Sequence, residues 1–160
     1  MDEKALIVVQ KLHDLFKRKG LTLSLAESCT GGLISHYVTA LPGASTFFKA
    51  GVVSYSAGAK KKILGVPFDI ISEYGVVSEE TAREMADKVR ALTETDFALS
   101  TTGNLGPDVL EEKEKGLVYV AVSTEGLTIS KTLRLQGDRE AIKEAAALLA
   151  LRFLLEMVEQ

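Results

Sequence analysis

The sequence is poor in the residues that build disulfides and metal centres. Its 160 residues include one cysteine, Cys29, and two histidines, His13 and His36. A single cysteine cannot form an intrachain disulfide, which favours a reducing compartment, and we expect a cytoplasmic protein. No histidine, cysteine or carboxylate cluster has the spacing of metal ligands. The sequence therefore predicts a site that uses neither a metal nor a cofactor.

Long apolar runs are also missing. A helix needs roughly 20 predominantly apolar residues to cross a bilayer, whereas the longest candidate, residues 145–155, is shorter and contains Arg152. Residues 1–4 have mixed charge and do not resemble a signal peptide. We therefore expect no association with a membrane.

Neither sign of charge dominates. Lysine and arginine number 19 against 22 aspartates and glutamates, so the formal net charge is −3. Broad binding to nucleic acid or to anionic lipid requires a basic face, and this balance argues against both partners. A local basic pocket for one phosphate remains compatible with it. The expected partner is a small molecule.

Apolar residues make up 46% of the chain, enough for one sizeable core. No repeat or long linker interrupts the sequence, which predicts a single domain over residues 1–160. Helical patterns alternate with strand patterns, and two strands flank Thr124-Glu125-Gly126. This order predicts an α/β fold: a three-layer α/β/α domain with a mixed, mostly parallel sheet and a C-terminal β-hairpin. The expected helices cover about 5–19, 33–40, 58–65, 79–92 and 139–158, and the expected strands about 21–26, 48–55, 97–101, 117–123 and 127–135.

Polar, glycine-containing segments follow the predicted strands, where open α/β sheets place their ligands. Residues 26–32 open a helix, and their N–H groups and hydroxyls suit an anion. Alternatively they form a capped turn in which Ser28 or Thr30 is the cap. Residues 100–108 supply Thr102 and Gly103 to a loop that either holds a substrate or oxyanion, or is purely structural.

Two other segments offer a nucleophile and a base. Ser45 lies in a loop between a helix and a strand, where it is either a nucleophile with a base nearby or an ordinary turn hydroxyl. Lys60 falls in the first turn of a helix, where burial would lower the pKa of its amine and make it a general base. Alternatively Lys60 belongs to a solvated basic turn. Cys29 is a second candidate nucleophile or a small buried residue.

Together these segments resemble one family, the CinA C-terminal domain family of nicotinamide-mononucleotide deamidases, also called competence/damage-inducible proteins. The resemblance extends in order over nearly the whole chain. The matching stretches are 26–32 (AESCTGG), 42–45 with Phe47-Phe48, 51–60 (GVVSYSAGAK), 64–66, 75–78 (GVVS), 103–108 and 137–139.

The resemblance implies a serine amidohydrolase that removes ammonia from the carboxamide of nicotinamide mononucleotide and yields nicotinate mononucleotide. It matches Ser45 to the nucleophile, Lys60 to the base and Tyr55 to a hydroxyl helper. Many family members carry a second, N-terminal domain, and this chain resembles the stand-alone form. With the glycine turn included, the residues expected to hold the substrate or orient the site are Ser28, Thr30, Gly31, Gly32, Thr102, Gly103 and Arg139.

One loop departs from the family pattern. The family usually reads Gly-Ile-Ala-Gly-Pro where residues 103–107 read Gly-Asn-Leu-Gly-Pro, and the charged run 111–115 follows. Leu105 is expected to narrow the pocket, and Asn104 to add a hydrogen-bonding group. This departure keeps two alternatives open: a non-catalytic nucleotide-binding or interaction module that retains the fold, and a deamidase of another amide.

The last predicted helix bears on assembly. Residues 145–155 leave almost no polar face over three turns, whereas a helix packed on one side of a sheet normally has one. Either the helix is covered on both sides within the domain, or a two-fold partner covers its outer side. The resemblance also implies a dimer, and we therefore expect a homodimer.

Overall fold

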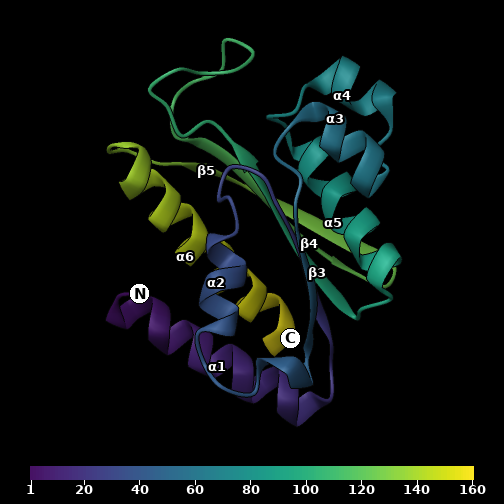
Figure 1. Cartoon of the computed structure of the whole chain (residues 1–160), viewed down its shortest axis with the longest axis vertical. Helices are drawn as coiled ribbons and strands as arrows, with labels where there is room; N and C mark the ends of the chain where they lie inside the picture. The colour runs from purple at the N-terminus through teal and green to yellow at the C-terminus, as the bar shows by residue number, and fades with distance from the viewer.

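The computed structural model describes all residues, 1–160. Figure 1 shows helices on both sides of a central sheet, which confirms the predicted three-layer α/β/α fold. The strands are β1 (Leu23–Glu27), β2 (Phe48–Val53), β3 (Phe97–Gly103), β4 (Leu117–Thr124) and β5 (Leu127–Arg134). The helices are α1 (Glu3–Lys19), α2 (Leu33–Thr39), α3 (Ala57–Ala59), α4 (Phe68–Tyr74), α5 (Glu79–Thr93) and α6 (Arg139–Glu159), with a 3-10 turn at Ala44–Thr46 and a π-helical turn at Lys60–Leu64.

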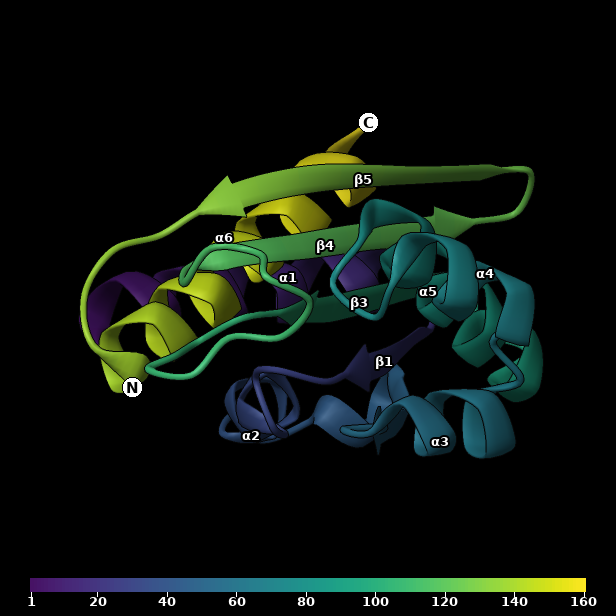
Figure 2. The same ribbon diagram turned by 90° about the horizontal axis from the view of Figure 1, so that it is seen from above.

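The sheet has the strand order β2-β1-β3-β4-β5. Strands β2, β1 and β3 pair in parallel, whereas β3 with β4 and β4 with β5 pair antiparallel, so β4 alone runs in the opposite direction. The hairpin β4–β5 forms one side of the sheet, as predicted (Figure 2). Because β1, β2 and β3 are parallel, the segments that follow their carboxyl ends meet at one edge of the sheet.

Local signals place most helix ends correctly. Ser78 accepts a hydrogen bond from Thr81 N at 3.1 Å and caps α5, and Asp138 accepts one from Ala141 N at 2.9 Å and caps α6. Both caps follow the preference for side-chain oxygens that satisfy free N–H groups of the first turn. Helix α4 was not predicted. It has no buried residue, so it lacks the apolar stripe by which a helix is recognised in a sequence.

Helix α6 lies inside the domain. Leu151 and Leu154 are fully buried, in one apolar cluster that also contains residues of α1 and of the sheet. Helix α1 packs against α6, and α6 packs against β3 and β4, so both sides of α6 are covered without a second chain. The inference of a partner from its missing polar face was therefore wrong. The homodimer itself stays a prediction that rests on the family resemblance.

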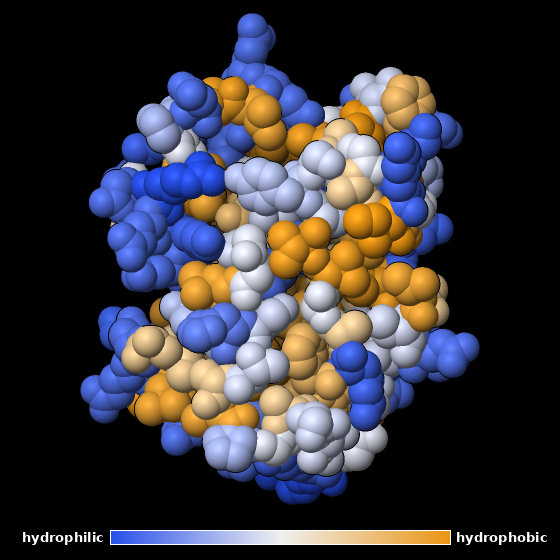
Figure 3. Space-filling model, in the orientation of Figure 1, coloured by the Kyte–Doolittle hydropathy of each residue, from blue (hydrophilic) through white to orange (hydrophobic).

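In the view of Figure 3, hydrophilic side chains gather along the left edge, and apolar side chains form a patch right of the centre. None of the helices combines the length and the hydropathy needed to span a bilayer.

Candidate active site

Lys60 and Ser28 make the central contact of the site. Lys60 Nζ lies 2.8 Å from Ser28 Oγ, and it also donates to the carbonyls of Ser54 and Tyr55 at 2.9 and 3.1 Å. An ammonium group has three N–H donors, so the charged form is fully hydrogen-bonded here. In the neutral form two N–H groups stay on the carbonyls, and the lone pair faces the Ser28 hydroxyl. The two carbonyls therefore orient the neutral amine so that its lone pair can accept the proton of the Ser28 hydroxyl.

The environment of Lys60 shifts its protonation equilibrium towards that neutral form. The side chain is 1% exposed, and burial lowers its pKa from 10.5 to about 8, a shift that the nearby Cys29 and Glu111 side chains reduce. Burial disfavours an ammonium because water no longer solvates its charge. Of the two alternatives left open by the sequence, a buried base and a solvated basic turn, the structure shows the buried lysine, and the direction of its pKa shift suits a general base.

Ser45 does not reach Lys60. It lies in the 3-10 turn before β2, and the bond from Leu23 N to Phe47 O at 2.9 Å holds this turn beside the amino end of β1. Ser28 and Lys60 follow the carboxyl ends of β1 and β2. The six residues of β2 span about 20 Å at roughly 3.3 Å each. The predicted pairing of Ser45 with Lys60 is therefore wrong within one chain, and the serine beside the lysine is Ser28.

Glu27 organises the turn that carries Ser28. Its carboxylate is 1% exposed and accepts hydrogen bonds from Ile34 N and Ser35 N, both at 2.9 Å, and from the hydroxyls of Ser35 and Thr30 at 2.8 and 2.6 Å. A buried carboxylate is tolerated only with such partners. Sequence reasoning missed this role, although a carboxylate at the end of an apolar strand is the signal for it.

The glycine turn, residues 28–32, presents backbone N–H groups to the site rather than the Thr30 side chain. Thr30 is fully buried, and its hydroxyl contacts Glu27 and Thr101, so it does not offer that hydroxyl to a substrate as predicted. The backbone N–H groups of Cys29 and Thr30 donate to no backbone carbonyl of the chain. Free N–H groups beside a nucleophile are suited to an oxyanion.

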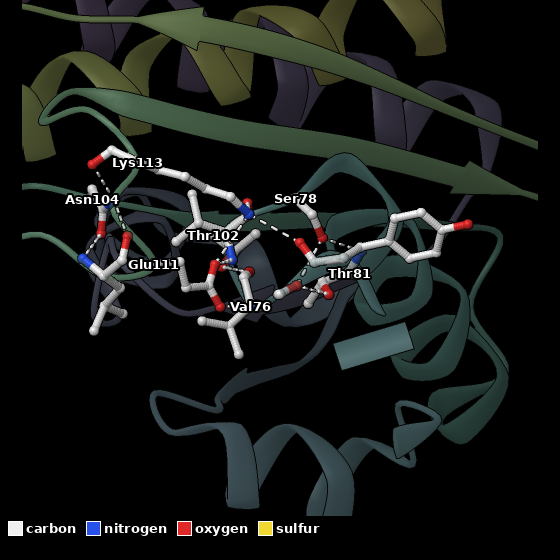
Figure 4. Close-up of polar contacts among 11 residues, drawn as sticks. Val76, Ser78, Thr81, Thr102, Asn104, Glu111 and Lys113 are labelled. Carbon is white, nitrogen blue, oxygen red and sulfur yellow. Dashed lines mark hydrogen bonds and ion pairs between the residues drawn. The ribbon is translucent and has the colours of Figure 1, made fainter. Parts of the chain in front are cut away.

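Tyr55 and Arg139 meet at the mouth of the site. Arg139 Nη2 donates to the Tyr55 hydroxyl at 2.9 Å, and Nη1 donates to the carbonyl of Gly106 at 2.8 Å. The Tyr55 hydroxyl therefore contacts Arg139, whereas only the Tyr55 backbone carbonyl contacts Lys60 and Ser28. Thr102, expected to hold the substrate, is 1% exposed and donates its hydroxyl to the carbonyl of Val76 at 2.7 Å (Figure 4).

A cavity of about 220 Å³ opens beside Ser28, and Lys60 lies buried next to this serine. A larger hollow of about 440 Å³ lies between the N-terminal ends of α1 and α6, but no nucleophile and base meet there. No three histidine, cysteine or acidic side chains gather where they could hold a metal ion. The cavity beside Ser28 is lined by Ser28, Cys29, Tyr55, Gly103, Asn104, Leu105, Asp108, Leu110 and Arg139.

Cys29 lines this cavity, but its thiol is expected to be unreactive. It is 5% exposed, and burial raises the pKa of its thiol to about 12, against the lowering effects of Thr101 and Lys60. Only a thiolate is nucleophilic, so we expect iodoacetamide to leave native Cys29 unmodified near neutral pH and to alkylate it fully in urea. Mass spectrometry of the two samples checks this. Rapid alkylation of the native protein would instead identify Cys29 as a reactive thiol.

A comparison with protein families finds one matching model, the CinA C-terminal domain, over residues 6–158. A relative from Caldanaerobacter subterraneus, named as a competence-damage inducible protein, is 48% identical over 135 residues. That alignment covers 84% of this chain and 33% of the relative. The chain thus spans about a third of the length of the curated relatives that it matches.

Solved structures agree with this match. The competence damage-inducible protein A of Klebsiella pneumoniae superposes with a TM-score of 0.95 at 29% identity, covering 98% of each chain. The competence/damage inducible protein CihA of Agrobacterium tumefaciens gives a TM-score of 0.95 at 32% identity, covering 100% of this chain and 98% of the other. The likeness therefore includes both the fold and the sequence.

Proposed function

The chain belongs to the CinA C-terminal domain family, and from that premise we propose that it is a serine amidohydrolase that removes ammonia from the carboxamide of nicotinamide mononucleotide. The observation that carries the chemistry is the 2.8 Å contact between Lys60 Nζ and Ser28 Oγ beside an open cavity. The substrate comes from the family resemblance. Ser28 takes the role of nucleophile that the sequence alone had led us to give Ser45.

Acylation follows from the arrangement of these groups. Neutral Lys60 removes the proton from Ser28 Oγ, which attacks the amide carbon and forms a C–O bond. The N–H groups of Cys29 and Thr30 bind the developing oxyanion. The C–N bond then breaks, and ammonia leaves with the proton that Lys60 returns.

Deacylation reverses the roles. Lys60 removes a proton from water, the hydroxide attacks the acyl-enzyme, and Ser28 leaves with the proton from Lys60. The product is the carboxylic acid, nicotinate mononucleotide. Arg139 uses two of its five N–H groups on Gly106 and Tyr55, so the others remain for the phosphate of the substrate.

The rate should depend on the charge of Lys60. Only the neutral amine accepts a proton, and its fraction falls tenfold for each pH unit below the pKa of about 8. We therefore expect ammonia release from nicotinamide mononucleotide with a kcat/KM that rises about tenfold per pH unit up to about pH 8 and then levels off. A coupled ammonia assay over this range measures it. A profile that is flat across neutral pH would remove Lys60 from the role of base.

A panel of amides distinguishes this proposal from its alternatives. Ammonia release from glutamine or from free nicotinamide, but not from the mononucleotide, would show that the protein is an amidohydrolase with a different substrate. Tight binding of the mononucleotide without any ammonia release would favour a non-catalytic nucleotide-binding module.

A further inference from the structure

The loop between β3 and β4, residues 104–116, is closed by its own asparagine. Asn104 is 3% exposed, and its side chain accepts from Leu110 N at 3.0 Å and donates to the carbonyls of Leu110 and Lys113 at 3.2 Å each. One buried amide thus joins both ends of the segment 104–113. Asn104, one of the two residues of 103–107 that depart from the family pattern, therefore fixes the shape of this loop.

A second set of contacts fastens the loop to the segment before α5. Glu111 accepts from Val76 N and Val77 N at 2.7 and 3.0 Å, and Lys113 Nζ donates to the carbonyls of Tyr74 and Val77 at 2.9 and 2.5 Å. Figure 4 shows Glu111 and Lys113 reaching across to this segment, with Asn104 beside them. The loop is therefore a fixed wall of the cavity.

Opposite charges line the cavity that this wall borders. Asp108 lies on the fastened loop, and Arg139 lies at the start of α6, and both line the cavity with Ser28. Arg139 is held by Gly106 and Tyr55, whereas Asp108 makes no ion pair within the chain. A ligand in this cavity therefore meets both a carboxylate and a guanidinium, and the guanidinium is held against the same loop two residues before Asp108.

We propose that Asp108 is a specificity-determining residue that selects amides whose ring carries a positive charge. This inference rests on the proposed function, and it identifies the positive charge of the ring as the feature of the substrate that the site recognises. In a pyridine mononucleotide the ring nitrogen bonded to ribose is permanently cationic, and the phosphate is anionic. Arg139 suits the anion, and Asp108 suits the cation, so the two side chains together match a substrate that carries both charges.

Two ligands that differ by one hydride, and therefore in the charge of the ring, test this assignment. Nicotinamide mononucleotide has a cationic ring, and its 1,4-dihydro form has the same ribose, phosphate and carboxamide on a neutral ring. Both are titrated calorimetrically into a Ser28→Ala protein, in which turnover does not interfere, and into the same protein with Asp108→Asn. We expect Asp108→Asn to weaken binding of the cationic ligand about fivefold, the effect of one partly exposed ion pair, and to leave binding of the neutral ligand within about twofold.

Glu112→Gln in the same Ser28→Ala background is the matched control. Glu112 is exposed on the same loop, and it does not line the cavity, so removal of its charge should change neither affinity. Equal weakening of both ligands by Asp108→Asn, no change for either, or no binding of either ligand would overturn the role of Asp108. Failure of the proposed function is separate, since the wild-type protein would then release no ammonia whatever the two affinities are.

Discussion

Ser28→Ala is expected to lower kcat for ammonia release by about 10³-fold or more, while the protein stays folded. Loss of the nucleophile of a serine hydrolase has an effect of at least this size, because the remaining groups only bind and polarise the substrate. Ser28 Oγ is within 2.8 Å of Lys60 Nζ and contacts the Tyr55 carbonyl only at 3.4 Å, so the substitution removes little structural bonding. Steady-state kinetics and circular dichroism on the same sample measure both parts.

Ser45→Ala is the matched control for this substitution. Ser45 is exposed at the opposite end of β2, so we expect its kcat to stay within about twofold of the wild-type value. Loss of activity in Ser45→Ala with an active Ser28→Ala protein would return the nucleophile to Ser45. Since Ser45 does not reach Lys60 in one chain, that result would require a second chain to complete the site.

Lys60→Met is expected to abolish turnover to a similar degree without unfolding the protein. Methionine nearly matches the length of lysine and has no basic nitrogen, so Ser28 loses its base. Two effects on stability oppose each other: the burial of a charge is relieved, but the carbonyls of Ser54 and Tyr55 lose their donor. The melting temperature should therefore change by no more than about 5 °C.

The pH profile separates this interpretation of Lys60→Met from a simple packing defect. Any residual hydrolysis in the variant should no longer level off near pH 8, because the group that titrates there in the wild-type protein is gone. A variant that keeps the wild-type profile at a reduced rate would show that another group is the base. A melting temperature far below the wild-type value would show that the lysine is needed mainly for structure.

Short-range patterns in the sequence determined most of the fold. The caps at Ser78 and Asp138, the hairpin around Gly126 and the alternation of helices and strands depend on neighbouring residues, and the structure confirms them. The segment around Lys60 placed the lysine at a helix start but left open whether it is buried or solvated, and the structure buries it. Helix α4 escaped prediction because it buries no residue and so leaves no apolar period in the sequence.

The contacts of the site were decided only by the tertiary structure. Ser45 and Lys60 flank the predicted strand 48–55, so the sequence already implied that they are apart, whereas only the pairing of β1 with β2 shows that Ser28 shares an edge of the sheet with Lys60. The same holds for α6, whose missing polar face is explained by α1 on its outer side.

The physical reason is that a strand of six residues separates its two ends by about 20 Å. Residues close in the sequence can therefore lie at opposite edges of the sheet, as Ser45 and Lys60 do. Residues far apart can meet, as Glu111 does with Val76, 35 positions away. Strand order and register decide which of these pairs form, and neither can be read from composition or periodicity.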